Sequence, residues 1–447
     1  MDLRYTAEDE AFRATVRAWL AENAPREPLR TVAEKKAWHR KLYEAGYLGM
    51  GWPKAYGGAQ GRAEEEGIVG EEMGKAGAPR SINWAGLGRG GPIEQAIVVE
   101  EMARAGAPGS INWAGLGLVG PTLIHHGADA QRERYLRNIL LGDEVWCQLY
   151  SEPNAGSDLA ALQCRADIDG DEFVVNGQKI WTSTAPEADM GILLVRTDRD
   201  APKHQGISYL MVDMHQPGIE VRPLRQVTGI ADEFAEVFFT NVRVPADNLI
   251  GELNTGWRIA QTTLSYERGG DTMGAVARLQ HSYARLLEIV QTPRADGSRM
   301  IDDPVVRQKL GQIMTDIEVV RYAALRVLSA AEKGGQPGPE SSISKLHYSE
   351  ADKRVYTLIQ EILGPYGQIL DGAPAAYAFA TDGSEGEHDN WPYLWMHPFS
   401  ETIYAGSSEI QKNIIGERVL GLPKEVRADR IAAAQPKAGT TAGEGGR

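Results

Sequence analysis

The chain has little cysteine and no long apolar run. Among its 447 residues there are two cysteines, Cys147 and Cys164, too few for a disulfide framework and without the spacing of metal ligands. We therefore expect buried thiols in a reducing, cytoplasmic setting. No segment reaches about 18 uninterrupted apolar residues, so we expect no membrane span. The acidic start, with Glu8, Asp9 and Glu10, does not fit a secretion signal.

Positive charge is also scarce. The net charge is −14 and no run of Lys or Arg stands out, so the electrostatic pattern of a nucleic-acid-binding protein is missing. No GxGxxG motif follows a predicted strand, which argues against a Rossmann nucleotide site. His125 and His126 stand before Gly127, as cations do at the C-terminus of a helix, and no further ligands lie at suitable spacing. We expect no metal site.

The stretch from Trp146 to Thr184 contains the pattern with the clearest chemistry. Its first half ends in SEPNAGSD, where small residues at 154–158 expose backbone N–H groups and a hydroxyl that suit an anionic phosphate. Its second half, NGQKIWTST, places the large indole of Trp181 beside the hydroxyls of residues 182–184. Together the halves predict a seat for a planar, phosphorylated cofactor, which we call the cradle.

Hydrophobic periodicity divides the chain into three parts. Residues 1–143 read as helical, with a capping box predicted at Thr6, and residues 144–250 alternate with a period of two, typical of a compact antiparallel β domain. Helical periodicity returns in 251–425, and 426–447 reads as a disordered tail. The candidate strands are 165–169, 172–181, 191–198, 206–214, 219–224 and 235–244. The fold class is α+β, mostly α.

The C-terminal part is predicted to be a four-helix bundle, because its periodic segments are long. These segments are 257–291, 304–333, 341–364 and 402–420. Between the last two, residues 371–392 are rich in Gly, Ala and acidic residues. We expect this loop to lie outside the core, as a lid or pocket wall.

A tandem duplication lies in the N-terminal part. Residues 68–88 and 97–117 match at 17 of 21 positions, which is too few copies for a solenoid. At two positions in copy one, including Gly70, and at the residue just before it, glycine stands where copy two and its preceding residue have Ala or Val. Each glycine inside a helix costs about 1 kcal/mol relative to Ala. We expect copy two to occupy the core and residues 60–91 to form a peripheral excursion. Deletion of 60–88 should then leave folding and cofactor content intact.

The order of these parts, with SEPNAGSD, NGQKIWTS and IYAGSSEIQKNIIGERVLGLP in sequence, resembles the acyl-CoA dehydrogenase family. The likeness covers about residues 1–425 apart from the extra copy. It implies a helical domain, a middle β domain, a four-helix domain and FAD as cofactor. It also implies an oligomer, a homodimer or a homotetramer.

The resemblance assigns roles to residues that match the family's motifs. Trp181 would lie against the flavin ring, Ser151 and Ser183 would bond its polar edge, and Ser157 would contact phosphate or CoA. The match to a stretch that holds the flavin of a neighbouring subunit is Arg307 to Leu310, with Leu in place of the usual Phe. Glu361 stands where the family has Gln before a Gly-rich turn. Positions that contact the adenylate half are matched by Ser407 and Glu409.

Dehydrogenation of a thioester needs a carboxylate to remove the α proton. Many family members carry a Glu before the Gly of the late motif, where this chain has Ala405. Isovaleryl-type and long-chain relatives carry it on an earlier helix, and Glu267 in TTLSYERGG matches that position. The backbone N–H of Ala405 can still polarise the thioester carbonyl. Arg268 would face the CoA moiety.

These observations predict a dehydrogenase that converts an acyl-CoA to its 2-enoyl-CoA and passes electrons to an electron-transfer flavoprotein. Two alternatives stay open on the same residues. One is a flavin oxidase or monooxygenase on this fold. The other is a catalytically silent partner subunit of a hetero-oligomer, to which Ala405, Glu361 and the duplication give weight. Acyl chain length and branching are not predicted.

Overall fold

The computed structural model describes most of the chain. The described ranges are 6–27, 29–58, 92–105, 107–228, 233–267, 272–294, 296–332, 338–369 and 391–424. Copy one of the duplication, Arg268, nearly all of the acidic loop and the predicted disordered tail therefore lie outside the described residues. No helix in these ranges is long and apolar enough to cross a bilayer.

Helices form the N-terminal part, as the periodicity predicts. The predicted capping box is confirmed: the Thr6 hydroxyl accepts from the Asp9 N–H at 3.1 Å, and Asp9 accepts from the Thr6 N–H at 2.7 Å. The long elements are α1 (Ala7–Asn23), α2 (Val32–Glu44), α4 (Pro92–Arg104), α5 (Gly120–His126) and α6 (Asp129–Leu141), and a π-helical turn, η2 (Gly115–Val119), leads into α5. Pro121 has no N–H to donate one turn back, which accounts for an irregular helix there.

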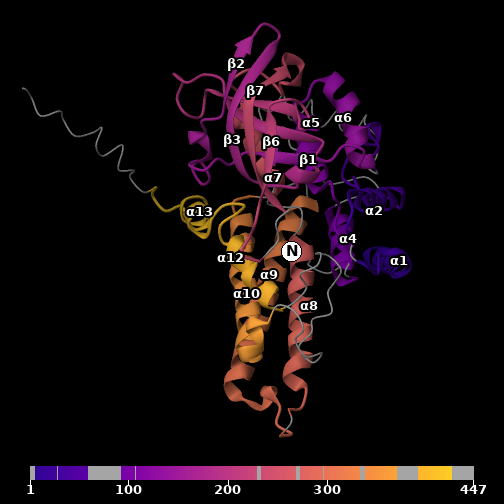
Figure 1. Cartoon of the computed structure of the whole chain (residues 1–447). Helices are drawn as coiled ribbons and strands as arrows, with labels where there is room; N and C mark the ends of the chain where they lie inside the picture. Colours follow the sequence, from indigo (N-terminus) through magenta and orange to yellow (C-terminus); the bar gives the residue numbers. More distant parts are fainter. Residues whose placement is uncertain are drawn as a thin grey trace, which may run out of the picture.

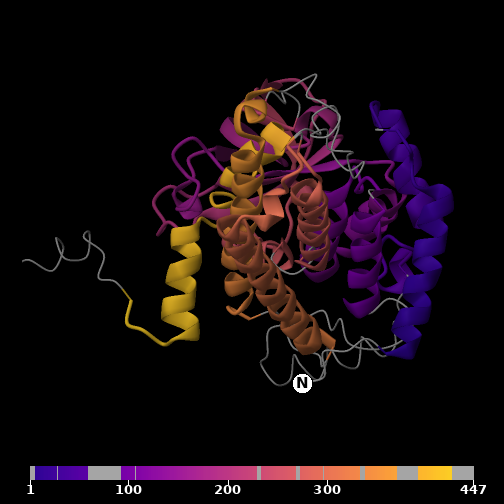
Figure 2. The same ribbon diagram turned by 90° about the horizontal axis from the view of Figure 1, so that it is seen from below.

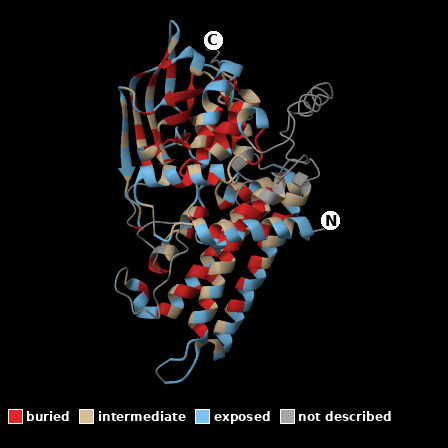
Figure 3. Cartoon of the chain, turned by 90° about the vertical axis from the view of Figure 1, so that its right-hand side faces the viewer, coloured by how far each residue is buried: buried red, intermediate tan, exposed pale blue. Residues whose placement is uncertain are grey.

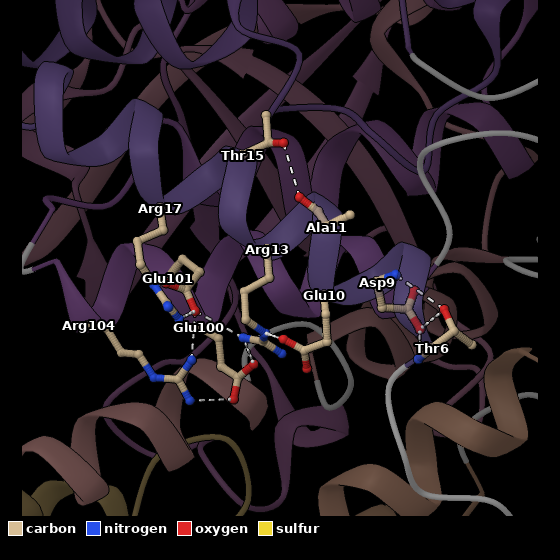
Figure 4. Close-up of polar contacts among 10 residues, drawn as sticks. All are labelled: Thr6, Asp9, Glu10, Ala11, Arg13, Thr15, Arg17, Glu100, Glu101 and Arg104. Atoms are coloured by element: carbon tan, nitrogen blue, oxygen red, sulfur yellow. Dashed lines mark hydrogen bonds and ion pairs between the residues drawn. The ribbon is translucent and has the colours of Figure 1, made fainter.

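Copy two of the duplication packs in the core. Ile97 and Val98 of α4 are 0% and 3% exposed, and α4 lies against α1 and α8. Ion pairs also hold α4 against α1: Arg13 donates to Glu100 at 2.6 Å and to Glu101 at 3.0 Å. Arg17 and Arg104 donate to Glu101 as well, so three guanidinium groups surround two buried carboxylates (Figure 4). A cleft of about 420 Å³ opens over this network, and no cradle residue lines it.

The middle part is a curled sheet that includes every predicted strand. Its strands are β1 (Trp146–Leu149), β2 (Arg165–Asp169), β3 (Glu172–Ser183), β4 (Met190–Arg196), β5 (Ile207–Asp213), β6 (Ile219–Leu224) and β7 (Phe234–Pro245). In the described residues the order is β1-β4-β2-β3-β7-β6, with β5 also on β4. Pairing is mostly antiparallel, but β1, which the sequence did not single out as a strand, pairs with β4 in parallel. Cys147 and Cys164 are buried thiols in this domain, as expected.

Long helices form the C-terminal part below the sheet (Figures 1 and 2). They are α7 (Gly256–Glu267), α8 (Thr272–Gln291), α9 (Pro304–Glu332), α10 (Ser341–Leu363) and the shorter α11 (Trp391–Met396), α12 (Pro398–Glu401) and α13 (Ser408–Ile414), which continues as a π turn, η9 (Ile415–Val419). Figure 3 shows buried faces turned inward along the long helices and through the sheet.

Two predictions for this part are wrong. The helix expected at 402–420 begins only at Ser408, because Ala405 and Gly406 have left-handed φ values of 50° and 89°, which a helix cannot contain. The end of the supposed outer loop is core: Trp391 is 1% exposed and packs against Tyr356, with ring centroids 6.3 Å apart. Burial of the large apolar indole of Trp391 outweighs the polar character of the acidic residues that precede it in the sequence.

Candidate active site

A break in the pairing of β3 brings the two halves of the cradle together. The register of β3 on β7 runs from Lys179 opposite Val237 to Thr182 opposite Ala235, so Ile180 and Trp181 have no partner on β7. The Ile180 N–H instead donates to the Ser151 carbonyl at 2.9 Å. A bulge of this kind redirects side chains. It joins SEPNAGSD to NGQKIWTST by a main-chain bond next to Trp181.

Trp181 is presented outward by a strained backbone. Its φ is +60°, a conformation that costs a non-glycine residue about 1 kcal/mol. The indole is 60% exposed, and its contact with the Phe234 ring is edge-on, with centroids 6.4 Å apart. A broad aromatic face is therefore open, with the half-buried Ser151 and Ser183 close to it in the two joined segments.

A buried ion pair, which the sequence analysis missed, fixes the cradle from inside. Lys179 is fully buried, and its Nζ donates to Glu152 Oε1 at 2.8 Å and to the Tyr150 carbonyl at 3.0 Å. The Glu152 carboxylate also accepts the N–H groups of Gln163 at 2.6 Å and Cys164 at 2.9 Å. The sequence did contain a signal for this pair: Lys179 stands at an inward-facing position of an alternating strand, and the other half of the cradle contains Glu152.

The small-residue turn after Pro153 closes on itself. Glu152 and Ala155 exchange backbone hydrogen bonds at 3.1 and 3.0 Å, and the residues that follow are exposed, Ser157 among them. Asp158 pairs with Lys203 at 2.7 Å, which places a cation beside the turn. The exposed hydroxyl and the nearby ammonium suit a phosphate contact.

Side chains from two helices hold the late turn at Ala405. Lys345 Nζ on α10 donates to the carbonyls of Glu401 at 2.6 Å and Gly406 at 2.8 Å. Gln411 on α13, 1% exposed, donates through Nε2 to the Ala405 carbonyl at 2.9 Å. The Ala405 N–H makes no hydrogen bond within the described part of the chain. A strained turn held this way presents a free N–H in a fixed orientation.

The two residues after this turn have local roles as well as the predicted ones. Ser407 is the N-cap of α13, and its hydroxyl accepts from the Ile410 N–H at 3.4 Å. Glu409 is exposed, and hydrogen bonds from its own backbone N–H and from Ser407 lower the pKa of its carboxyl.

Glu267 is the last residue of α7, and its side chain lies outside the described residues, as does Arg268. The structure therefore fixes the helix that carries Glu267. One turn earlier, Thr263 is fully buried against the β domain, bonded to Tyr209 at 3.0 Å. The assignment of Glu267 as base stays a prediction.

The remaining predicted residues lie in the helical bundle. Arg307 is exposed near the start of α9, while Leu310 is 4% exposed and packs in the bundle core. Leu310 therefore has little surface to offer a group on another subunit. Glu361 of α10 is ion-paired with Lys309 of α9.

The cradle fits a flavin in its described geometry. An exposed indole face, nearby hydroxyls and a small-residue turn beside a lysine match a planar ring that continues into a phosphate. The described residues contain no group of three or more His, Cys, Asp or Glu that could hold a metal ion. The arrangement is thus suited to a planar organic cofactor.

Known proteins resemble this chain along most of its length. Three domain families match: "Acyl-CoA dehydrogenase, N-terminal domain" at 6–86 and 82–143, "Acyl-CoA dehydrogenase, middle domain" at 147–242 and "Acyl-CoA dehydrogenase, C-terminal domain" at 254–420. Acyl-CoA dehydrogenase IpdE1 of Mycobacterium tuberculosis is 36% identical, over 94% of this chain and 99% of its own.

Solved structures agree with the sequence matches. The ChsE4-ChsE5 complex from Mycobacterium tuberculosis has a TM-score of 0.75 at 29% identity, covering 95% of this chain and 100% of that one. The Tcur3481-Tcur3483 steroid ACAD has a TM-score of 0.74, also at 29% identity and the same coverage. The three-part fold is therefore shared.

Proposed function

This chain belongs to the acyl-CoA dehydrogenase family, and we propose that it oxidises an acyl-CoA thioester to the 2-enoyl-CoA at an FAD site built on the cradle. The proposal rests mainly on Trp181, whose exposed indole stands at a bulge in β3. The neighbouring Ile180 N–H donates to the Ser151 carbonyl and so joins the two halves of the cradle at this point. Bound FAD would supply the acceptor for the hydride that leaves Cβ. Residues of the chain would bind the substrate, remove its α proton and stabilise the charge on its carbonyl.

Ser151, Trp181 and Ser183 would hold the flavin ring, and Ser157 would contact phosphate or CoA. Ser407 and Glu409 would serve the adenylate half, with Arg307 reaching the cofactor of a neighbouring subunit. The geometry supports the cradle residues most directly, because Trp181 and Ser157 are exposed and a main-chain bond joins the two halves of the cradle. Glu361 and Leu310 have the weakest support, since their described contacts lie within the bundle.

Glu267 is the base in this proposal. The carboxylate removes the α proton, and negative charge develops on the thioester carbonyl. The electron pair of the broken Cα–H bond then becomes the second bond of C=C as a hydride, with its own electron pair, leaves Cβ. The support is positional: the late motif has Ala405 where relatives have Glu, and α7 ends at Glu267. Arg268 would face the CoA moiety.

The Ala405 N–H would stabilise the developing negative charge on the carbonyl oxygen. Backbone donors of this kind act through position and need no side-chain chemistry. Support for the role is that this N–H has no hydrogen-bond partner among the described residues, in a turn held by Lys345 and Gln411.

The substrate we propose is a thioester with a bulky, ring-bearing acyl group, and the electron acceptor an electron-transfer flavoprotein. Support for the substrate class is the likeness to a protein described as a steroid ACAD. Anaerobic titration of the purified yellow protein with straight-chain, branched and steroid-derived acyl-CoAs tests the function and the substrate class. Loss of the oxidised flavin absorbance only with ring-bearing substrates is the expected result; no loss with any of them refutes the function.

A second candidate is a silent subunit that needs a catalytic partner. It is favoured by Ala405 in the late motif and by the likeness to a chain from the ChsE4-ChsE5 complex. In that case the isolated chain would lack flavin or fail to lose absorbance in the same titration, and activity would appear when a second chain is added.

A further inference from the structure

Four buried hydroxyl groups form a continuous chain through the middle of the molecule. Tyr150 Oη donates to Tyr209 Oη at 2.7 Å, and Tyr209 Oη lies 3.0 Å from Thr263 Oγ1. Thr263 Oγ1 lies 2.7 Å from Thr122 Oγ1. All four residues are between 0% and 5% exposed. We call this set the hydroxyl chain.

The hydroxyl chain joins all three parts of the fold. Thr122 lies on α5, Tyr209 on β5 and Thr263 on α7, while Tyr150 follows β1 and precedes Ser151 of the cradle. The elements themselves touch: α7 packs on β5, on α5 and on η2 (Figure 1). The chain therefore spans the junction between the flavin cradle and the helix that ends at Glu267.

One end of the hydroxyl chain is bonded to main chain, and the other end belongs to Tyr150, whose own backbone is held in place. At one end Thr122 donates to the Leu118 carbonyl at 2.7 Å, within the π turn η2. At the other end the Tyr150 carbonyl accepts from Lys179, which is paired with Glu152. Each hydroxyl has one proton, and the order Tyr150 to Tyr209 to Thr263 to Thr122 to Leu118 uses each proton once.

The chain is built to hold position and has no outlet for protons. It ends on a carbonyl, which accepts a hydrogen bond and has no proton to pass on. Burial raises the pKa of Tyr209 to about 12 and raises the pKa of Tyr150 well above its ordinary value, so both hydroxyls stay protonated through the neutral range. Buried networks of this kind, fully satisfied, make a local structure rigid.

We propose that Tyr150, Tyr209 and Thr263 are positioning residues that set α7, and with it Glu267, against the Ser151–Trp181 cradle. The inference rests on the proposed function, because it takes Glu267 as the base. Thr263 and Glu267 are four residues apart on one helix and so lie on the same side, about 6 Å apart along the axis. Anchoring Thr263 therefore fixes the position of α7 along its axis and its rotation about that axis, and with them the point on the helix from which the Glu267 side chain projects.

The test compares single-hydroxyl deletions in the purified flavin-loaded protein. Tyr209→Phe removes the central link and Thr263→Val removes the link on α7 at nearly constant shape, while Thr263→Ser keeps the hydroxyl. Tyr356→Phe is the matched control, since it removes a buried tyrosine hydroxyl that bonds Ser282 at 2.9 Å within the helical bundle. Two readouts are followed: hydrogen exchange of residues 256–267, and the rate of flavin reduction by acyl-CoA.

Tyr209→Phe and Thr263→Val are expected to speed exchange in α7 roughly tenfold. They should slow flavin reduction about 10²-fold while changing KM little, because a misplaced base loses rate and not binding. The pH dependence should keep its shape, and Thr263→Ser should restore both readouts. Tyr356→Phe should leave α7 exchange and the reduction rate at parent values.

Unchanged α7 exchange in both Tyr209→Phe and Thr263→Val would overturn the inference, as would an equal loss of rate in Tyr356→Phe. Failure of the proposed function has a different signature, because the parent protein itself would then show no reduction by acyl-CoA. The exchange measurement alone would in that case decide whether the hydroxyl chain holds α7.

Discussion

Trp181 combines backbone strain with a large exposed aromatic surface. Neither favours the folded chain by itself, since a φ of +60° costs about 1 kcal/mol and an open indole buries little area. The bulge that creates this conformation also bonds Ile180 to Ser151. Strain of this kind at a site that several contacts over-determine points to a binding role.

Replacement of Trp181 by Ala should therefore weaken FAD binding without unfolding the protein. Loss of an aromatic stacking partner predicts about 10-fold lower affinity for FAD. The melting temperature of the flavin-free protein should stay at the parent value, because the indole is already 60% exposed. Fluorescence titration with FAD measures the first and thermal melting the second. Ile168→Ala, which removes a similarly exposed side chain (61%) from the same sheet, is the control; equal FAD affinity in Trp181→Ala and the parent would contradict the cradle.

At the scale of elements, helix α4 is held by charge as well as by apolar packing. Glu101 is 2% exposed and bonds to Arg13, Arg17 and Arg104. Burial alone would raise the pKa of Glu101, but the hydrogen bonds from the three guanidinium groups outweigh it and lower the pKa to about 2. The same glutamate pair occurs in copy one, so the charges alone do not select copy two. Ala and Val in place of glycine favour copy two, because Ile97 and Val98 also have identical counterparts in copy one.

The lowered pKa of Glu101 predicts an acid-sensitive junction between α1 and α4. Because the folded pKa lies below the ordinary value of 4.5, the ion pair stabilises the fold above that value and loses its contribution as pH falls from about 4.5 to about 2. The shift corresponds to about 3 kcal/mol at neutral pH. Glu101→Gln should lower the melting temperature at pH 7 and flatten its decline below pH 4.5. A variant that melts with the parent's pH profile would show that Glu101 does not carry this dependence.

Sequence patterns predicted elements better than they predicted the turns between them. Strands β2 to β7 and the helices at 304–332 and 341–363 follow from local alternation or periodicity, and each lies within a few residues of its expected range. The left-handed turn at Ala405 was missed because an alanine side chain carries no signal for positive φ. The Lys179–Glu152 pair was missed because it depends on two segments meeting, which local pattern does not record. The sequence motifs did single out Ser151 and Trp181, and in the structure a main-chain bond from Ile180 to Ser151 brings their two segments together.

At the scale of the whole molecule, one side of α9 exposes several apolar side chains. Met314, Val319 and Tyr322 are 42%, 44% and 50% exposed within about two turns, and Gly311 lies on the same side. Apolar surface in such a row suits contact with another subunit. Arg307, expected to reach the flavin of a neighbouring subunit, lies near the start of the same helix.

Charge placed on this side of α9 should therefore reduce assembly. Val319→Asp combined with Tyr322→Glu is expected to shift the protein toward the monomer, because a desolvated, unpaired carboxylate is costly at an interface. Size-exclusion chromatography with light scattering gives the mass at several concentrations. Ile168→Asp, an equally exposed position on the sheet, should leave the mass of the parent. An unchanged mass in the α9 double variant would place the interface elsewhere.

The central claim is that one carboxylate at the end of α7 starts the oxidation of an acyl-CoA at a flavin held by the cradle. The most direct measurement follows the absorbance of oxidised flavin when the purified parent and Glu267→Gln are mixed anaerobically with a reactive acyl-CoA. The exchange of a carboxylate for an amide keeps the size of the side chain and removes its basicity. We predict that both proteins bind FAD equally and that the parent loses its flavin absorbance while Glu267→Gln keeps it. Loss of absorbance at the same rate in both proteins would contradict the account.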